Sequence, residues 1–293
     1  MYMENSSVIK VFATGLKGLK TVHGIREKTG NVIVVVGKDT KILNDYSEEI
    51  VSYCKKNNIQ YTYESLDHDL DFGLAIAAGW QKMIYNIPSN SLIVFHDSLL
   101  PKYRGFNPLV TALLNQDDYI GLTALTAAES YDCGNILYQV KIPISYPILI
   151  EDAINKVSDA YYDVAKIIYE LFVENKLNGV PQDDNNATYS LWRDEEDYLI
   201  DWSSTAEGIQ LKINSLGYPY LGASTTVNNE LVRIKKSTLL NDVLIENRIP
   251  GKIIFFADGN PVVVCGKGLL RLDEIENNHG KKITITKMRT RFK

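Results

Sequence analysis

The chain contains 293 residues, of which 45% are hydrophobic and 23% are charged, a composition typical of a soluble protein with a sizeable core. Its longest apolar runs, such as residues 32–36, have the length of a strand and are far shorter than the roughly 20 residues of a membrane span. The N-terminal residues lack the charged and apolar regions of a signal peptide, so we expect a cytoplasmic protein without a membrane partner. The three cysteines are widely separated and form neither metal-ligand pairs nor a disulfide framework, which predicts reduced thiols and no bound metal.

The charge is unevenly distributed along the chain. Residues 203–293 contain 14 lysines and arginines against 8 acidic residues, a net charge of +6, whereas residues 1–202 carry −11. A basic second domain could bind a polyanion, although a pyrophosphate needs only a few cations. The tail at residues 281–293 is equally compatible with a solvated surface, and both interpretations remain open.

The first half of the chain alternates strands and helices. Strands are expected at residues 7–12, 32–36 and 92–95, and a helix at 47–57. Apolar strands that alternate with helices favour a parallel sheet covered on both faces, and hence a Rossmann-like α/β domain. Gly15 and Gly18 follow the first strand, but the full dinucleotide fingerprint and the P-loop lysine are missing, so neither NAD nor ATP is indicated.

The second half predicts a separate, strand-rich domain. A long amphipathic helix at residues 150–175 is followed by an Asn/Asp/Gly/Pro-rich segment at 178–186. We therefore predict a catalytic domain over residues 1–182, a linker over 183–203 and a second domain over 204–293. After a short helix at 205–214, strands are expected at residues 230–234, 251–256, 261–265, 269–274 and 283–285. With a hairpin turn at Asp258-Gly259, this pattern favours a small OB-like β-barrel.

The string HDSLLPKYRG, which runs from His96 to Gly105, directly follows a buried strand. It therefore stands at the carboxyl end of a strand, where open α/β sheets place their sites. The string closely resembles the histidine-containing signature of the formyltetrahydrofolate-dependent formyltransferases, a family that includes methionyl-tRNA formyltransferase, glycinamide ribonucleotide transformylase and sugar N-formyltransferases. The resemblance extends from about residue 70 to 275 and includes the segments at residues 112–115, 120–123, 131–137, 192–197, 200–202, 218–223 and 250–253.

This resemblance implies a reaction and two catalytic residues. The formyl donor would be 10-formyltetrahydrofolate, and an amine would attack the formyl carbon to give a tetrahedral oxyanion. His96 would polarise the formyl oxygen or hydrogen-bond the oxyanion. Asp132 would orient His96 and help to remove the amine proton, or would alternatively only cap the turn before Gly134.

Position 94 departs from the family pattern. The family's catalytic asparagine lies two residues before the histidine, and Val94 occupies that position in this chain. Because valine has no side-chain donor, Lys82 or Asn107 would have to replace it, or His96 would act alone. The same departure leaves open a non-catalytic protein that binds folate or a nucleotide sugar.

The resemblance also places the ligands. The pterin is expected between the segment at residues 76–83 and the loop after the segment that contains Asp132. The cofactor-binding residues are expected to be Trp80, Lys82, Met83, Glu129 and Ser130. Trp80 either lines this pocket or packs beneath it. For the acceptor, Arg104 and Arg193 are cations suited to a pyrophosphate, and Tyr218 and Tyr220 are rings suited to stacking. A structural role is the alternative for each of them.

The acceptor follows from elimination within the family. A tRNA-binding enzyme would need clustered cations near the catalytic motif, and the first domain is acidic. Glycinamide ribonucleotide transformylase is typically a single domain without the barrel. We therefore predict a sugar N-formyltransferase that acts on a nucleotide-linked amino-deoxysugar in surface polysaccharide biosynthesis, without a nucleic-acid partner. The sequence is compatible with a homodimer, and a methionyl-tRNA formyltransferase-like enzyme is the alternative.

Overall fold

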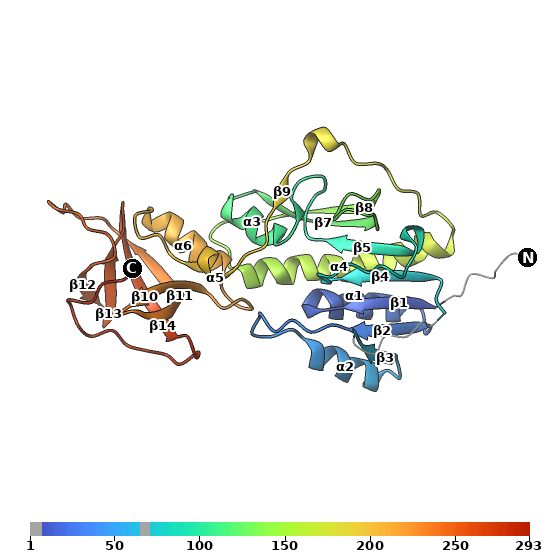
Figure 1. Cartoon of the computed structure of the whole chain (residues 1–293), viewed down its shortest axis with the longest axis horizontal. Helices are drawn as coiled ribbons and strands as arrows, with labels where there is room; N and C mark the ends of the chain where they lie inside the picture. The colour runs from blue at the N-terminus through green and yellow to red at the C-terminus, as the bar shows by residue number, and fades with distance from the viewer. Residues whose placement is uncertain (1–7, 65–70) are drawn as a thin grey trace, which may run out of the picture. The chain divides into compact units, whose positions relative to one another are not determined.

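The computed structural model describes residues 8–64 and 71–293. The chain forms two compact units. The first is made mainly of residues up to Trp192, and the second mainly of residues from Arg193 onward, with residues 113–116 and 145–151. The change of unit between Trp192 and Arg193 falls inside the segment 183–203. Figure 1 shows the chain coloured from the N-terminus to the C-terminus.

A seven-stranded sheet, in the order β3-β2-β1-β4-β5-β7-β8, forms the centre of the first unit (Figure 1). The strands are β1 (Ile9–Ala13), β2 (Val32–Val36), β3 (Gln60–Tyr63), β4 (Leu74–Ala78), β5 (Leu92–His96), β7 (Tyr119–Thr126) and β8 (Ile136–Pro143). The first five run parallel to one another, whereas β7 and β8 are antiparallel additions beside β5. The predicted Rossmann-like α/β class is thus confirmed, with a mixed rather than wholly parallel sheet. β8 follows β7 through a short loop, and a short connection can join only antiparallel neighbours.

The helices that accompany this sheet include α1 (Gly15–Lys28), α2 (Ser47–Lys56), α3 (Pro108–Leu114) and α4 (Ile150–Val173). Helix α4 contacts β5 through Tyr161, whose hydroxyl donates to the Phe95 carbonyl at 3.2 Å. It also contacts α1, because a Cβ on Gly24 would lie 2.4 Å from the Tyr162 carbonyl oxygen. Only glycine allows this approach, so α1 and α4 pack together on the sheet. Within the described residues, no helix combines the length and the apolar character of a membrane-spanning segment.

A short two-stranded sheet joins the signature string to the segment after α4. Strand β6 (Arg104–Gly105) pairs in parallel with β9 (Tyr189–Ser190). The chain between α4 and β9 contains the short helix η3 (Asp184–Asn186), and η2 (Ser89–Ser91) precedes β5. The segment that the composition indicates as a linker is therefore partly built into the first unit.

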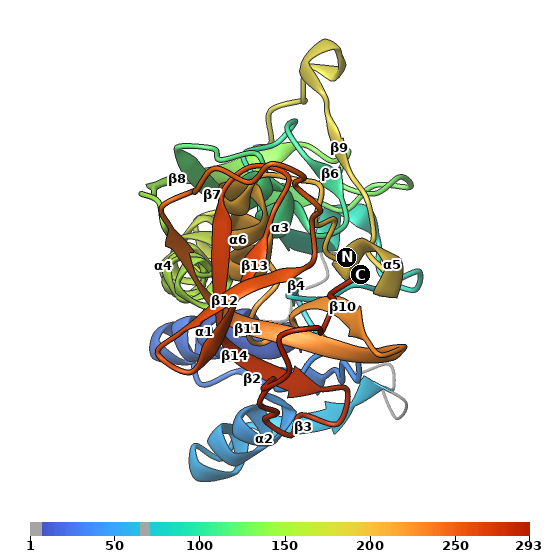
Figure 2. The same ribbon diagram turned by 90° about the vertical axis from the view of Figure 1, so that its left-hand side faces the viewer.

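The second unit contains helices α5 (Glu195–Tyr198) and α6 (Ala206–Ser215) and a five-stranded antiparallel sheet in the order β10-β11-β14-β13-β12 (Figure 2). The strands are β10 (Ala223–Val227), β11 (Glu230–Leu240), β12 (Ile253–Ala257), β13 (Asn260–Val264) and β14 (Leu269–Asn277). The C-terminal residues bridge the two edges of this sheet, since Phe292 pairs with Val227 and Arg291 pairs with Lys252. This bridging gives the sheet a barrel-like closure.

Two local predictions in the second unit have different outcomes. The Asp258-Gly259 turn joins β12 to β13, and both residues have the positive φ that such a two-residue hairpin requires. The strand predicted at residues 283–285 is wrong, because that segment has no strand conformation. Its alternating Ile and Thr residues have strand propensity, but the contact with β14 stops at the start of the segment. Lys282 forms an isolated bridge with Glu276, and the Ile283 amide donates to the Ile275 carbonyl oxygen at 2.9 Å.

Candidate active site

His96 is the last residue of β5, which lies between β4 and β7 in the sheet. Its side chain is buried, and its Nε2 lies 2.8 Å from the Tyr103 carbonyl oxygen. A carbonyl oxygen only accepts hydrogen bonds, so Nε2 carries a proton. The loop that supplies this carbonyl is held by Thr123, whose Oγ1 donates to the Ser98 carbonyl at 2.6 Å and accepts from the Leu100 amide at 3.2 Å.

Asp132 lies in the loop between β7 and β8, with a positive φ of 56°. Its Oδ1 is 3.3 Å from His96 Nδ1, and its Oδ2 accepts a hydrogen bond of 2.8 Å from the Gly105 amide. The side chains of His96 and Asp132 are only 8% and 10% exposed, so this contact is shielded from water. The structure therefore brings together the two residues that the signature predicts as catalytic.

The tautomer of His96 determines what this pair can do. Because the Nε2 proton is directed at Tyr103, a neutral ring would turn the lone pair of Nδ1 toward the carboxylate of Asp132. Two facing lone pairs repel each other in a buried site, and a proton between Nδ1 and Oδ1 removes the repulsion. The pair is thus arranged to share one proton, which a reacting nitrogen or oxygen could receive.

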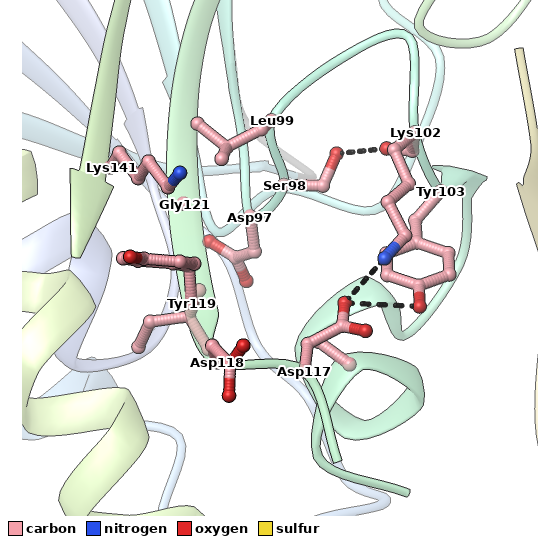
Figure 3. Close-up of a pocket in the computed structure, with 12 residues that line it drawn as sticks. Asp97, Ser98, Leu99, Lys102, Tyr103, Asp117, Asp118, Tyr119, Gly121 and Lys141 are labelled. Atoms are coloured by element: carbon pink, nitrogen blue, oxygen red, sulfur yellow. Dashed lines mark hydrogen bonds and ion pairs between the residues drawn. The ribbon is translucent and has the colours of Figure 1, made fainter. Parts of the chain in front are cut away.

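A cavity of about 240 Å³ adjoins the loop that follows His96, but neither His96 nor Asp132 lines it (Figure 3). Asp117 accepts hydrogen bonds from Lys102 Nζ at 2.7 Å and from the Tyr103 hydroxyl at 3.1 Å in this cavity. On the opposite side, Lys141 Nζ lies 3.6 Å from the centre of the Tyr119 ring. The hydrogen bond to Asp117 fixes the side chain of Tyr103, the residue whose carbonyl oxygen contacts His96.

The predicted cofactor-binding residues lie on two segments. Trp80 follows β4 and packs edge-on against Phe12 with ring centroids 5.2 Å apart, while its buried indole nitrogen has no hydrogen-bond partner among the described residues. Lys82 is exposed, and its Nζ is paired with Glu64 at 2.7 Å. Met83 is half-buried, and Glu129 and Ser130 are exposed at the start of the loop that carries Asp132. Their roles in binding stay predictions.

The side chain at position 94 provides no polar group to the site. Val94 is half-buried and packs against the apolar cluster that contains Phe12 and Ala77. Of the two substitutes considered, Lys82 is engaged by Glu64. Asn107 has a positive φ and accepts the Thr111 amide at the start of α3 through its carbonyl oxygen.

The predicted acceptor residues lie in different surroundings. Arg104 is buried, and its guanidinium donates to Gln182 and Asp184. Because these contacts occupy its guanidinium, they favour a structural role for Arg104 over the predicted contact with a pyrophosphate. Arg193 and Tyr218 are half-buried in the second unit, and their binding roles stay predictions.

Gln182 contacts the loop that carries Asp132 and was not predicted from the sequence. Its amide donates to the carbonyl oxygens of Asp132 and Gly134 at 2.7 and 2.8 Å. Because it lies in a segment with the composition of a linker, no local signal identifies it. Among the described residues, no group of three or more His, Cys, Asp or Glu side chains is placed to hold a metal ion.

Comparisons with known proteins agree with this geometry. The family model described as formyl transferase matches residues 11–171, and the model of the formyl transferase C-terminal domain matches residues 193–293. A methionyl-tRNA formyltransferase of Treponema denticola is 32% identical over 196 residues, which are 65% of this chain and 60% of the relative. The chain thus matches less than two thirds of that relative's length.

Solved structures share the fold at low sequence identity. An N-formyltransferase from Helicobacter canadensis, in complex with folinic acid and dTDP-3-aminofucose, has a TM-score of 0.66 and 18% identity, and the match covers 94% of this chain and 99% of that one. HypX from Aquifex aeolicus has a TM-score of 0.65 and 16% identity, with 93% of this chain but only 44% of that one covered.

Proposed function

Since the chain belongs to the formyl transferase family, as the signature at His96 predicts, we propose that it is an N-formyltransferase acting on a nucleotide-linked amino-deoxysugar. Its formyl donor in this proposal is 10-formyltetrahydrofolate. The observation that carries the proposal is the contact between His96 and Asp132 at the carboxyl end of β5. It provides a buried imidazole–carboxylate pair at the carboxyl end of β5, where the family resemblance expects the reaction.

The shared proton fits the chemistry of this donor. When bound, 10-formyltetrahydrofolate supplies the formyl carbon and leaves as an amine that must gain a proton. The His96–Asp132 pair gives its proton to that departing nitrogen, and Asp132 takes up the proton that the attacking amine loses. One proton is donated and one is recovered, so the pair returns to its starting state. In this proposal His96 also polarises the formyl oxygen.

Two observations support a sugar acceptor. The Helicobacter canadensis enzyme that was crystallised with an aminosugar nucleotide matches along nearly the whole length of both chains. Residues 1–202, which contain the His96–Asp132 pair, carry a net charge of −11, which opposes the approach of a large polyanion such as tRNA. We include a cytoplasmic location and a place in surface polysaccharide biosynthesis in the same proposal.

Methionyl-tRNA formylation is the second candidate, and it is favoured by the 32% identity to the Treponema denticola protein. The two acceptors can be tested in parallel. The protein would be incubated with 10-formyltetrahydrofolate and either a panel of nucleotide aminosugars or initiator methionyl-tRNA, and the products analysed by mass spectrometry for an added formyl group. Formylation of an aminosugar supports the proposal, and formylation of the tRNA alone overturns it. Folate binding without either product would indicate a non-catalytic binder.

A further inference from the structure

Gln182 connects a buried arginine to the loop that carries Asp132. Its side-chain oxygen accepts hydrogen bonds from Arg104 Nε at 3.0 Å and Nη2 at 2.8 Å. Its side-chain nitrogen donates to the carbonyl oxygens of Asp132 and Gly134. Both donors and the acceptor of the amide are therefore used, which fixes the side chain in one orientation.

The other end of this connection is rigid. Arg104 is only 3% exposed, and it lies in β6, which is paired with β9. Burial by itself would lower the pKa of Arg104, but the hydrogen bond to Asp184 raises it above its usual value, so the side chain stays charged. A buried guanidinium held in this way can anchor a partner, because moving it would leave its donors unpaired.

The loop at Asp132 is held close to β7 and to Gln182. Asp132 has a φ of 56°, in the left-handed region that aspartate adopts more often than most residues other than glycine. Gly134 lies so close to Thr126 that a Cβ would be 1.7 Å from the Thr126 carbonyl oxygen, which leaves no room for the loop to shift in that direction. Gln182 binds the loop at the two carbonyls on either side of Cys133.

We propose that Gln182, held by Arg104, is a positioning residue that orients the Asp132 carboxylate toward His96. We call this set of contacts the Arg104–Gln182 clamp. The same strand that supplies Arg104 also supplies the Gly105 amide, which donates to Asp132 Oδ2. The clamp thus fixes the main chain of Asp132, while the next residue in β6 fixes its side chain. The expected effect of the clamp on kcat rests on the proposed function. Its expected effect on the loop that carries Asp132 does not.

Gln182→Glu tests the clamp with little change in size. The glutamate can still accept from Arg104, but it cannot donate to the two carbonyls. We expect kcat to fall about 10- to 100-fold, as is typical for a small misplacement of a catalytic group, with the KM for 10-formyltetrahydrofolate changed less than about threefold. In the Asp132→Asn background, the same substitution should change kcat less than about twofold, because Gln182 acts through Asp132. Equal fold-changes in both backgrounds would overturn the proposal.

Two control variants separate positioning from general stability. Gln210→Glu also removes an amide donor from a half-buried glutamine, since Gln210 Nε2 donates to the Ser237 carbonyl at 3.1 Å in the second unit. Glu174→Ala removes a carboxylate that pairs with Lys176 at 2.8 Å on the surface of the first unit, and it leaves the contacts of Arg104 and Gln182 in place. Both should keep kcat within about threefold of the wild type.

Hydrogen exchange of the Gly105 amide, measured by NMR, tests the clamp without turnover. Because this amide donates to Asp132, we expect its exchange to be at least about tenfold faster in Gln182→Glu and unchanged in Gln210→Glu. Unchanged exchange in Gln182→Glu would refute the clamp even if the enzyme is active. A wild-type protein that formylates no acceptor, with faster exchange in Gln182→Glu, would instead refute the proposed function and retain the clamp.

Discussion

Replacing Asp132 with asparagine tests the shared proton most directly. The asparagine oxygen can accept the Gly105 amide as Oδ2 does now, and its NH₂ group can donate to Nδ1 of a neutral His96. The Nε2 proton can still be donated to Tyr103. All hydrogen bonds at the site are therefore preserved, and only the transferable proton is lost.

The expected loss of rate follows from this single change. General acid–base catalysis typically contributes about 10²- to 10⁴-fold, which corresponds to roughly 2.7 to 5.5 kcal/mol of activation free energy. The free energy of unfolding should change by less than about 1 kcal/mol, because no buried group is left unpaired. The variant should therefore fold like the wild type and turn over 100 to 10,000 times more slowly by this estimate.

Single-turnover formylation of the identified acceptor, followed by mass spectrometry, measures the rate, and urea denaturation measures the stability. The control is Asp118→Asn, an exposed aspartate two residues before Ile120 in the wall of the neighbouring cavity, which should leave both quantities unchanged. An Asp132→Asn rate within about tenfold of the wild type would refute the shared-proton reasoning, since a change of about 1.4 kcal/mol is too small for a lost acid–base group.

Three further predictions concern His96, Val94 and the three cysteines. His96→Ala should abolish turnover while folate affinity, measured by calorimetry, changes little, because the lost interaction acts in the transition state; a rate within about tenfold of the wild type would exclude His96 as the central group. Val94→Asn should lower the free energy of unfolding in urea by about 1 to 3 kcal/mol, because it buries an amide in the apolar cluster around Phe12, and an unchanged stability would contradict this. Burial raises the pKa of the Cys54 and Cys265 thiols to about 11 and about 12, so at pH 8 both should stay protonated and resist iodoacetamide. The half-exposed Cys133 should be alkylated first in peptide mapping, and equal labelling of all three cysteines would contradict the burial argument.

Several features of the fold follow from local sequence patterns. The run at residues 32–36 is apolar at every position, and such a run can be satisfied only by a strand that is buried on both faces. The helical spacing at residues 150–175 corresponds to α4, and the Asp258-Gly259 turn corresponds to the β12–β13 hairpin. The signature string identifies His96 at the end of β5 because the string is long and continuous.

Other features of the fold depend on contacts between segments that are far apart in the sequence. The antiparallel direction of β7 and β8 depends on which strands become neighbours in the sheet. Residues 283–285 form no strand because their contact with β14 ends at Ile283. A local pattern encodes neither outcome. The sequence predicts that Arg104 binds a pyrophosphate because it is a cation within the signature string. In the structure Arg104 is buried, and its guanidinium instead holds the side chain of Gln182.

The sequence by itself determined the family, the fold class and the identity of His96 and Asp132 as a candidate pair, because each depends on residue types at short spacing. Only the tertiary structure decided how the two side chains meet. The Tyr103 carbonyl selects the tautomer of His96, and Gln182, 50 residues after Asp132 in the chain, holds the loop opposite it. Hydrogen-bond direction and the closure of distant segments are properties of the folded chain, so no run of neighbouring residues could specify them.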